Sequence, residues 1–194
     1  MTPGTEAVVC LRPFARADLA IVEPWFRDPD TRRYLGGPEW PAAMLERVDQ
    51  VVGIEFRGAI QTGAYRYLAQ AGGRAVGYID CGTFDRCTIY GGEGKHGPII
   101  TGSIDAPTGS IAFVIDPRRR RCRLGRAMIA ALLQRPELQA VELFEAGVEP
   151  ANIPSRRCLE AAGFALRAEA PDCEGMLYYR IRRGEFGADA GLLA

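Results

Sequence analysis

The sequence has little of what metal and redox sites require. Its 194 residues include one histidine, His96, and none of its six cysteines stands in a Cys-x-x-Cys pair. Zinc sites need several closely spaced ligands of these types, so we expect no metal. The even number of cysteines permits disulfides, but only in an oxidising compartment. The six are Cys10, Cys81, Cys87, Cys122, Cys158 and Cys173.

Targeting and membrane signals are also missing. The opening MTPGTEAVVCLRPF contains no basic segment followed by an apolar stretch. No apolar run approaches the roughly 18 residues that a membrane helix needs. We therefore expect a cytoplasmic protein with reduced thiols and no membrane partner.

The chain lacks an excess of either charge, since 24 basic residues face 24 acidic ones. One segment departs from this balance, because residues 118–123 hold five arginines interrupted only by Cys122. Such a run first suggests a nucleic-acid patch, which steeply salt-dependent binding would identify. The overall balance gives no large-scale attraction to nucleic acid, so we expect no such partner and look for a local explanation.

The hydrophobic pattern predicts alternating strands and helices along most of the chain. Expected strands cover residues 7–13, 64–70, 74–84, 110–116, 140–148, 164–170 and 174–183. Expected helices cover residues 15–26, 41–57, 124–134 and 152–164. Residues 27–40 are predicted as a loop, 85–109 as a long glycine- and proline-rich insertion, and the tail from about 184 as frayed. The order predicts a single domain over 1–194, with a mixed sheet, helices on both faces, and the apolar strand at 110–116 in its centre.

The arginine run lies where the strand at 110–116 passes into the helix at 124–134. Backbone N–H groups at a helix N-terminus lack partners and carry partial positive charge, so such a place binds phosphate. The run is therefore a candidate phosphate cradle, to which arginine side chains could add bidentate contacts.

Three stretches together resemble the GNAT superfamily of N-acetyltransferases, over roughly residues 8–182. AFVIDPRRRRCRLGRAM resembles the acetyl-CoA segment, an apolar strand followed by Arg/Gln-x-x-Gly-x-Gly/Ala, with Arg120 in the first place and Gly125 as the last glycine. VEPANIPSRRCLEAAGF resembles the Val-x-x-x-Asn-x-x-Ser/Ala and Gly-Phe segment. LRPFARADLAIVEPWFRDPDTRRYLGG is similar to the start of the branch that includes ribosomal-protein N-terminal and aminoglycoside acetyltransferases. The resemblance implies an α/β (α+β) fold with a mixed, mostly antiparallel sheet of six to seven strands and helices on both faces.

The resemblance also implies acetyl-CoA as co-substrate and assigns residues to it. The strand backbone would meet the pantetheine and polarise the thioester carbonyl, and the loop would wrap the pyrophosphate. Asn152 would bond the pantetheine amide, although it fits equally well as a helix cap. The implied acetyl-CoA residues are Phe113, Val114, Ile115, Arg120, Arg121, Cys122, Arg123, Leu124, Gly125, Arg126, Asn152 and Ser155.

Three positions depart from the family pattern. Arg123 stands where the middle glycine of the loop is usual, and Arg121 where another glycine is common. An arginine can still donate its backbone N–H there if its φ stays negative, whereas glycine takes either sign. Leu159 stands where many members carry a tyrosine that reprotonates the leaving thiolate. Ser155, one turn earlier, then becomes the candidate proton donor, as the resemblance implies.

Acetyl transfer needs a neutral amine, although free alkylamines have pKa values of about 10. The segment SIAFVI offers no carboxylate, so a general base must come from another element. Asp80, at the end of a predicted hairpin strand, and Glu149 are the main candidates. A water chain would need no dedicated base. Alternatives are Glu142, Glu145 and His96.

The resemblance implies direct attack of the amine on bound acetyl-CoA. In the superfamily the loop between the first two helices helps form the acceptor site, so Tyr34 and Trp40 are its expected lining. The acceptor would be a small-molecule amine or a protein N-terminus, and a homodimer through 85–109 stays open. The alternative is a catalytically silent acyl-CoA-binding module or sensor, because the tyrosine and an obvious base are both missing. CoA release with a panel of amines would separate the two.

Overall fold

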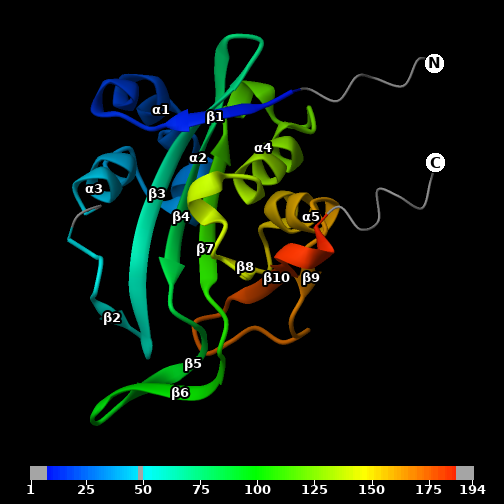
Figure 1. Cartoon of the computed structure of the whole chain (residues 1–194). Helices are drawn as coiled ribbons and strands as arrows, with labels where there is room; N and C mark the ends of the chain where they lie inside the picture. The colour runs from blue at the N-terminus through cyan, green and yellow to red at the C-terminus, as the bar shows by residue number, and fades with distance from the viewer. Residues whose placement is uncertain (1–7, 48–49, 187–194) are drawn as a thin grey trace.

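The structure is a computed structural model that describes residues 8–47 and 50–186. Its centre is a sheet in which seven strands lie in the order β1-β3-β4-β7-β8-β10-β9, and β2 pairs with β3 outside this order (Figure 1). Only β7 and β8 pair in parallel among the described strands. The strands are β1 (Cys10–Pro13), β2 (Glu55–Phe56), β3 (Ala59–Ala71), β4 (Arg74–Phe84), β7 (Thr108–Ile115), β8 (Leu143–Val148), β9 (Ala165–Leu166) and β10 (Leu177–Arg182). The predicted mixed, mostly antiparallel sheet with a central strand at 110–116 is confirmed.

Helices α4 (Leu124–Leu133) and α5 (Ile153–Ala161) cover one face of this sheet. Met128, Ile129 and Leu132 recur at helical spacing on α4 and are fully buried against strand side chains such as Ile79 and Phe144. α4 connects β7 to β8, as a parallel pair requires.

Helices α1 (Leu19–Phe26), α2 (Pro29–Leu35) and α3 (Trp40–Glu46) lie on the opposite face (Figure 1). Val22 and Phe26 of α1 pack on a row of strand partners, Leu68, Tyr78 and Val114. Since side chains alternate along a strand, Arg66, Asp80 and Ser110 face the same side as this row. The predicted helices on both faces are confirmed.

The loop predicted over 27–40 is wrong, because α2 lies within it. The Asp28 carboxylate accepts a hydrogen bond from Thr31 N at 3.1 Å and caps the helix, and Pro29 occupies its first position. Asp and Pro begin helices as readily as they form turns, so composition alone misled the prediction.

The helix predicted over 41–57 is also wrong beyond its first turns. α3 ends at Glu46, residues 48–49 lie outside the described part, and residues 55–56 form β2. Gly53 and Gly58 have φ values of +83° and +80°, which bend the chain on either side of β2.

Most of the predicted insertion at 85–109 is a hairpin of β5 (Cys87–Gly94) and β6 (Gly97–Ile104) that is separate from the main sheet, and its last two residues begin β7. Figure 1 shows it projecting from the lower end of the molecule. The predicted first strand starts later, at Cys10, and residue 7 lies outside the described part, as does most of the tail predicted from 184.

All six cysteines lie in the described residues and are free. Within residues 8–47 and 50–186, no helix combines the length and apolar character needed to span a bilayer.

Candidate active site

β7 and β8 run side by side for only a few residues. The last of their three parallel pairs joins Ser110 to Glu145, after which β7 continues to Ile115 and β8 to Val148. No further pair joins the two strands in the described structure, while β4 stays paired with β7 as far as Ile115. The backbone edge of residues 111–115 that faces β8 is therefore open to a ligand.

Three residues expected at the acetyl-CoA thioester lie on this open stretch. Val114 is buried among the side chains of the α1–α3 face, whereas Phe113 and Ile115 pack against the α4–α5 core. Each of the three side chains is thus packed in one of the two cores. The groups left to contact a ligand are their backbone N–H and C=O groups.

The loop between β7 and α4 adopts a glycine-like path at two arginines. The φ angles of Arg121 and Arg123 are +65° and +59°, so neither has the negative φ considered above. This left-handed conformation costs a non-glycine residue roughly 1–2 kcal/mol. The chain therefore keeps the backbone path for which glycine is suited and carries strain at two arginines.

The start of α4 presents a row of unused donors. None of the backbone N–H groups of residues 121–125 donates a hydrogen bond within the described part of the chain, and the first bond into the helix runs from Ala127 N to Arg123 O at 3.2 Å. Consecutive free N–H groups at a helix N-terminus, where the helix dipole is positive, suit a pyrophosphate.

The Arg120 side chain is engaged within the protein. Its Nη2 donates to the Asp28 carboxylate at 2.6 Å and to the Thr31 hydroxyl at 2.8 Å, which ties the loop to the start of α2. Burial acts to raise the pKa of Asp28, but the bonds from Arg120 and Thr31 outweigh it and hold that pKa below its ordinary value.

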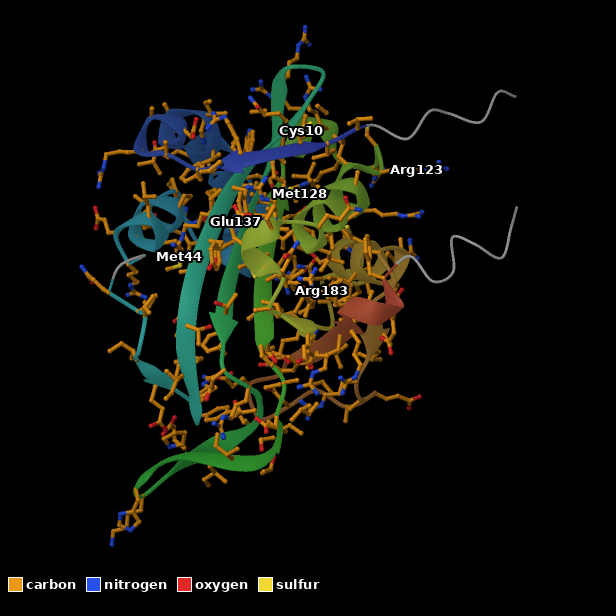
Figure 2. The ribbon with its side chains drawn as sticks, viewed as in Figure 1. Cys10, Met44, Arg123, Met128, Glu137 and Arg183 are labelled. Atoms are coloured by element: carbon orange, nitrogen blue, oxygen red, sulfur yellow. The ribbon has the colours of Figure 1, made fainter. Side chains whose placement is uncertain are left out.

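The neighbouring loop side chains are exposed. Arg121, Cys122 and Arg123 are all at the surface, and Figure 2 shows Arg123 at the outer edge of the molecule. Leu124, by contrast, is buried in the α4–α5 core. Arg121 and Arg123 are therefore the loop side chains whose exposure would let them reach a bound phosphate.

At the start of α5, Asn152 acts as a helix cap. Its Oδ1 accepts a hydrogen bond from Ser155 N at 3.3 Å, which confirms the cap prediction. The Asn152 amide NH₂ and the Ser155 hydroxyl make no hydrogen bond to other described residues. Leu159 is fully buried in the core.

A cavity of about 110 Å³ lies on the α1–α3 face of the sheet, beside the point where β7 and β8 part. Ser110 and Glu145, the last residues paired across the two strands, both line it. Hairpin residues Thr88 and Tyr90 and the segment after β9 complete its walls. A ligand in this cavity would border a ligand held between the strands.

Asp80 lies one row further along the same face. It is opposite Ala112 in the register, while Gly82 is opposite Ser110, so no side chain of β4 separates Asp80 from the cavity row. Two residues of a strand span roughly 6.6–6.8 Å. Asp80 thus lies one row outside the residues that line the cavity.

Asp80 is paired with a buried arginine. Arg66 Nε lies 2.8 Å from Asp80 Oδ2, and the Tyr78 hydroxyl donates to the same oxygen at 3.4 Å. Burial raises the pKa of Asp80 to about 6, although Arg66 and Tyr78 act to lower it. The contact between Arg66 Nε and Asp80 is an ion pair whose angles do not meet those of a hydrogen bond. Neither Nε nor Nη1 of Arg66 has a hydrogen-bond partner among the described residues.

The other carboxylate candidates are placed differently. Glu145 lines the cavity, but Arg180 donates to it from Nε and Nη2, both at 3.0 Å. Glu149 follows the end of β8 and lies four residues, about 13 Å of extended strand, beyond Glu145. Neither Asp80 nor Glu149 lines the cavity, and of the two Asp80 lies in the row next to its lining.

The two aromatic residues expected at the acceptor site, Tyr34 and Trp40, do not line this cavity. Trp40 stacks on Phe26, with ring centroids 5.6 Å apart, and meets the edge of Tyr78. Tyr34 contacts the guanidinium of Arg33. Neither lines the cavity at Ser110 or the second cavity beside residues 116–118. Tyr90 lines the first cavity.

Several residues around the cavity escaped the sequence analysis. Arg57 donates to Glu174 at 2.7 Å across 117 positions of sequence, and Arg167 lines the cavity from the segment after β9. Arg66 had one local signal, since the alternating pattern of 64–70 places it on the same face as Leu68.

Known proteins resemble this chain in sequence and in fold. The family model described as an acetyltransferase (GNAT) domain matches residues 9–165. A relative from Bacillus subtilis (strain 168), the uncharacterised N-acetyltransferase YfmK, is 24% identical over 169 residues, which cover 85% of this chain and 90% of the relative.

Solved structures with the same fold include several acetyltransferases, among them the following two. AAC(6')-Ib in complex with ribostamycin and coenzyme A has a TM-score of 0.64 and 17% identity, over 96% of this chain and 98% of that chain. The spermidine N-acetyltransferase of Vibrio cholerae in complex with CoA and spermine has a TM-score of 0.60 and 12% identity, over 92% and 97%. The match to the family model spans most of the chain, and the protein therefore belongs to the GNAT acetyltransferases, as the resemblance predicted.

Proposed function

We propose that the protein moves the acetyl group of acetyl-CoA to the primary amine of a small molecule by direct attack, without a covalent enzyme intermediate. The observation that carries the proposal is the place of the cavity at Ser110 and Glu145, where β7 and β8 part. An acyl group held between the strands and an amine held in the cavity would meet at this point. The amine ligands named for the two solved neighbours, ribostamycin and spermine, favour a small-molecule acceptor.

The chain offers acetyl-CoA a continuous set of donors. The open edge of residues 111–115 would hold the pantetheine and orient the thioester carbonyl, and the N–H groups of residues 121–125 would hold the pyrophosphate. Asn152 would add its unused amide NH₂ to the pantetheine. The exposed Arg121 and Arg123 would pair with phosphate oxygens.

Asp80 would act as the general base. Because burial raises its pKa to about 6, its carboxylate is ionised at neutral pH yet more basic than an ordinary aspartate. It would take the proton from the attacking amine, directly or through one water. Arg66 beside it would keep the carboxylate oriented.

Ser155 would return a proton to the departing thiolate. A thiol has a pKa of about 8.5, so the thiolate leaves more readily when a hydroxyl donates to it. Ser155 lies in the first turn of α5, and its hydroxyl has no other partner in the described structure. It would fill the role that Leu159 cannot.

The test measures CoA release from acetyl-CoA with a panel of amines, including alkylamines, aminoglycosides and a short peptide with a free N-terminus. We expect turnover with at least one small amine, and a loss of about 100-fold or more in Asp80→Asn. Acetyl-CoA affinity, measured by calorimetry, should be unchanged in that variant. Tight acetyl-CoA binding without turnover on any amine would instead favour a silent acyl-CoA-binding module.

A further inference from the structure

The carboxylates that line the cavity are hydrogen-bonded within the protein, but only one of them is paired with an arginine in the described part of the chain. Arg180 donates two hydrogen bonds of 3.0 Å to Glu145, and the Asp172 carboxylate accepts the backbone N–H groups of Glu174 and Met176 at 2.9 and 2.8 Å. Glu145 is therefore a weak site for a cationic group of a ligand, whereas Asp172 keeps its negative charge and has no cationic partner among the described residues.

Two of the three arginines that line the cavity are also engaged. Arg57 forms a two-bond contact with Glu174 and lies over the ring of Tyr90, with its guanidinium carbon 4.0 Å from the ring centroid. Arg86 donates to the Asp85 carboxylate from Nε at 3.0 Å and from Nη2 at 2.9 Å. The Arg57–Glu174 and Arg86–Asp85 pairs therefore add no net charge to the cavity wall.

Arg167 is different, because it has no carboxylate partner among the described residues. Its guanidinium carbon lies 5.9 Å from the ring centroid of Tyr178. Arg167 and Tyr178 both line the cavity, and Arg167 is exposed, which places its charge at the cavity mouth. Among the described residues, the wall therefore carries one arginine without a carboxylate partner, Arg167, and one carboxylate without a cationic partner, Asp172.

We infer that the acceptor is a primary amine that also carries a carboxylate, which Arg167 binds. This inference rests on the proposed function and names its substrate class. A guanidinium binds carboxylate through two parallel N–H donors, and no protein carboxylate competes for Arg167. The carboxylate of the acceptor would be held at the mouth while its amine reaches toward Asp80.

The same charges work against a polycationic acceptor. Such a molecule would bring its positive groups close to Arg167 and would find Glu145 and Glu174 already paired with arginines, which leaves Asp172 for only one of those groups. Repulsion by an unpaired charge is a usual source of specificity. Spermine and ribostamycin, bound by two neighbours of the same fold, should therefore be poor acceptors here.

The test compares amines that differ only in charge. kcat/KM is measured for 4-aminobutyrate, butylamine and 1,4-diaminobutane. We expect 4-aminobutyrate to exceed the other two by about tenfold or more, which corresponds to roughly 1.4 kcal/mol. In Arg167→Gln the preference should fall below about threefold, and Arg167→Lys should keep part of it. Arg74→Gln, an exposed arginine in the β3–β4 turn, is the control and should keep the full preference.

A binding measurement separates this inference from the proposed function. Calorimetry with CoA-loaded protein compares 4-aminobutyrate with 1,4-diaminobutane and needs no turnover. Preferential binding of the carboxylated amine, lost in Arg167→Gln, would support the inference even if no amine were acetylated. Turnover or binding that favours the diamine, or a preference unchanged in Arg167→Gln, would overturn it and leave acetyl transfer itself standing.

Discussion

Gly125 of α4 lies directly against Cys158 of α5. A Cβ placed on Gly125 would fall 2.6 Å from the Cys158 sulfur and 4.0 Å from its Cβ. Real Cβ atoms do not approach other atoms as closely as 2.6 Å, so the absence of a side chain at Gly125 sets the distance between the two helices. The same helices carry the expected phosphate donors and Asn152, so this contact also fixes the width of the proposed acetyl-CoA site.

Gly125→Ala should therefore destabilise the protein by about 1–3 kcal/mol, because overpacking outweighs the better helix propensity of alanine. Urea unfolding measures the change. Cys158→Ala is the matched control. It removes the sulfur, so that a Cβ on residue 125 would lie 4.0 Å from the Cβ of residue 158, which is an ordinary contact distance. The double variant should regain most of the loss, with a coupling of about 1 kcal/mol or more. Additive effects would show that the glycine is needed for another reason.

Relief of backbone strain is expected at the two loop arginines. Arg121→Gly and Arg123→Gly remove a left-handed cost of roughly 1–2 kcal/mol, while glycine gives back about 0.5–1 kcal/mol through its freer unfolded chain. Each variant should be as stable as the wild type or up to about 1 kcal/mol more stable by urea unfolding. Arg123→Ala keeps the strained φ and should show no gain. A marked loss of stability in both glycine variants would mean that the arginine side chains support the loop.

The buried Asp80 carboxylate should make folding stability depend on pH. Its pKa of about 6 in the folded protein lies above the roughly 3.9 of an unfolded aspartate. The folded state then holds this proton to a higher pH, so the contribution of Asp80 to stability falls as pH rises from about 4 to 6 and is level above that. Asp80→Asn should flatten this part of the profile, whereas Asp105→Asn, at an exposed position, should not. An unchanged profile would contradict the raised pKa.

The ionisation of Asp80 should also affect catalysis, and it should raise kcat/KM over the pH range in which it lowers folding stability. kcat/KM should rise with pH to a plateau above about 6, since only the carboxylate form of Asp80 can accept a proton. In Asp80→Asn, the residual kcat/KM should no longer show this rise near pH 6. Its persistence in that variant would assign the base to another group.

Local patterns predicted the elements of the proposed acetyl-CoA site better than the elements that surround the proposed acceptor cavity. The strand, arginine loop and helix around Gly125 are contiguous, so apolar periodicity and the helix start were sufficient to place them. The acceptor cavity instead joins side chains from β2, β5, β8 and β10, and no local rule brings Arg57 to Glu174.

The pairing of Arg66 with Asp80 depends on a further irregularity. A regular hairpin closed by Ala71 and Arg74 would put Arg66 opposite Ile79. A register shift between Ala69 and Gln70 moves it opposite Asp80 instead. The alternation of apolar and polar residues does not reveal a one-residue shift of register. The sequence analysis therefore identified Asp80 as a candidate base but not Arg66 as its partner.

Arg120→Ala should weaken acetyl-CoA binding by about three- to tenfold, because the phosphate loop loses its attachment to α2. If Arg120 acts by holding the loop, Asp28→Asn should have a similar effect, since it removes the charge that Arg120 binds. Calorimetry with acetyl-CoA measures both, and Arg118→Ala, in the exposed turn before the loop, is the control. Unchanged affinity in Arg120→Ala would count against the placement of this loop at the pyrophosphate.

Arg183 should be a major source of stability, although it lies outside the proposed site. Its guanidinium donates to the backbone oxygens of Val141 at 2.7 Å, Leu133 at 2.6 Å, and Leu138. It thereby caps the C-terminus of α4 and the turn that leads to β8. Burial lowers the pKa of Arg183, which indicates that its charge is held away from water.

Arg183→Met should leave these carbonyls without donors and destabilise the protein by about 3 kcal/mol or more, measured by urea unfolding. Arg183→Lys, which keeps the charge but cannot reach all three oxygens at once, should lose less and remains measurable if the methionine variant does not fold. The exposed neighbour Arg182→Met should change stability by no more than about 0.5 kcal/mol. Equal effects at the two positions would show that the carbonyl contacts of Arg183 do not hold the α4–β8 connection together.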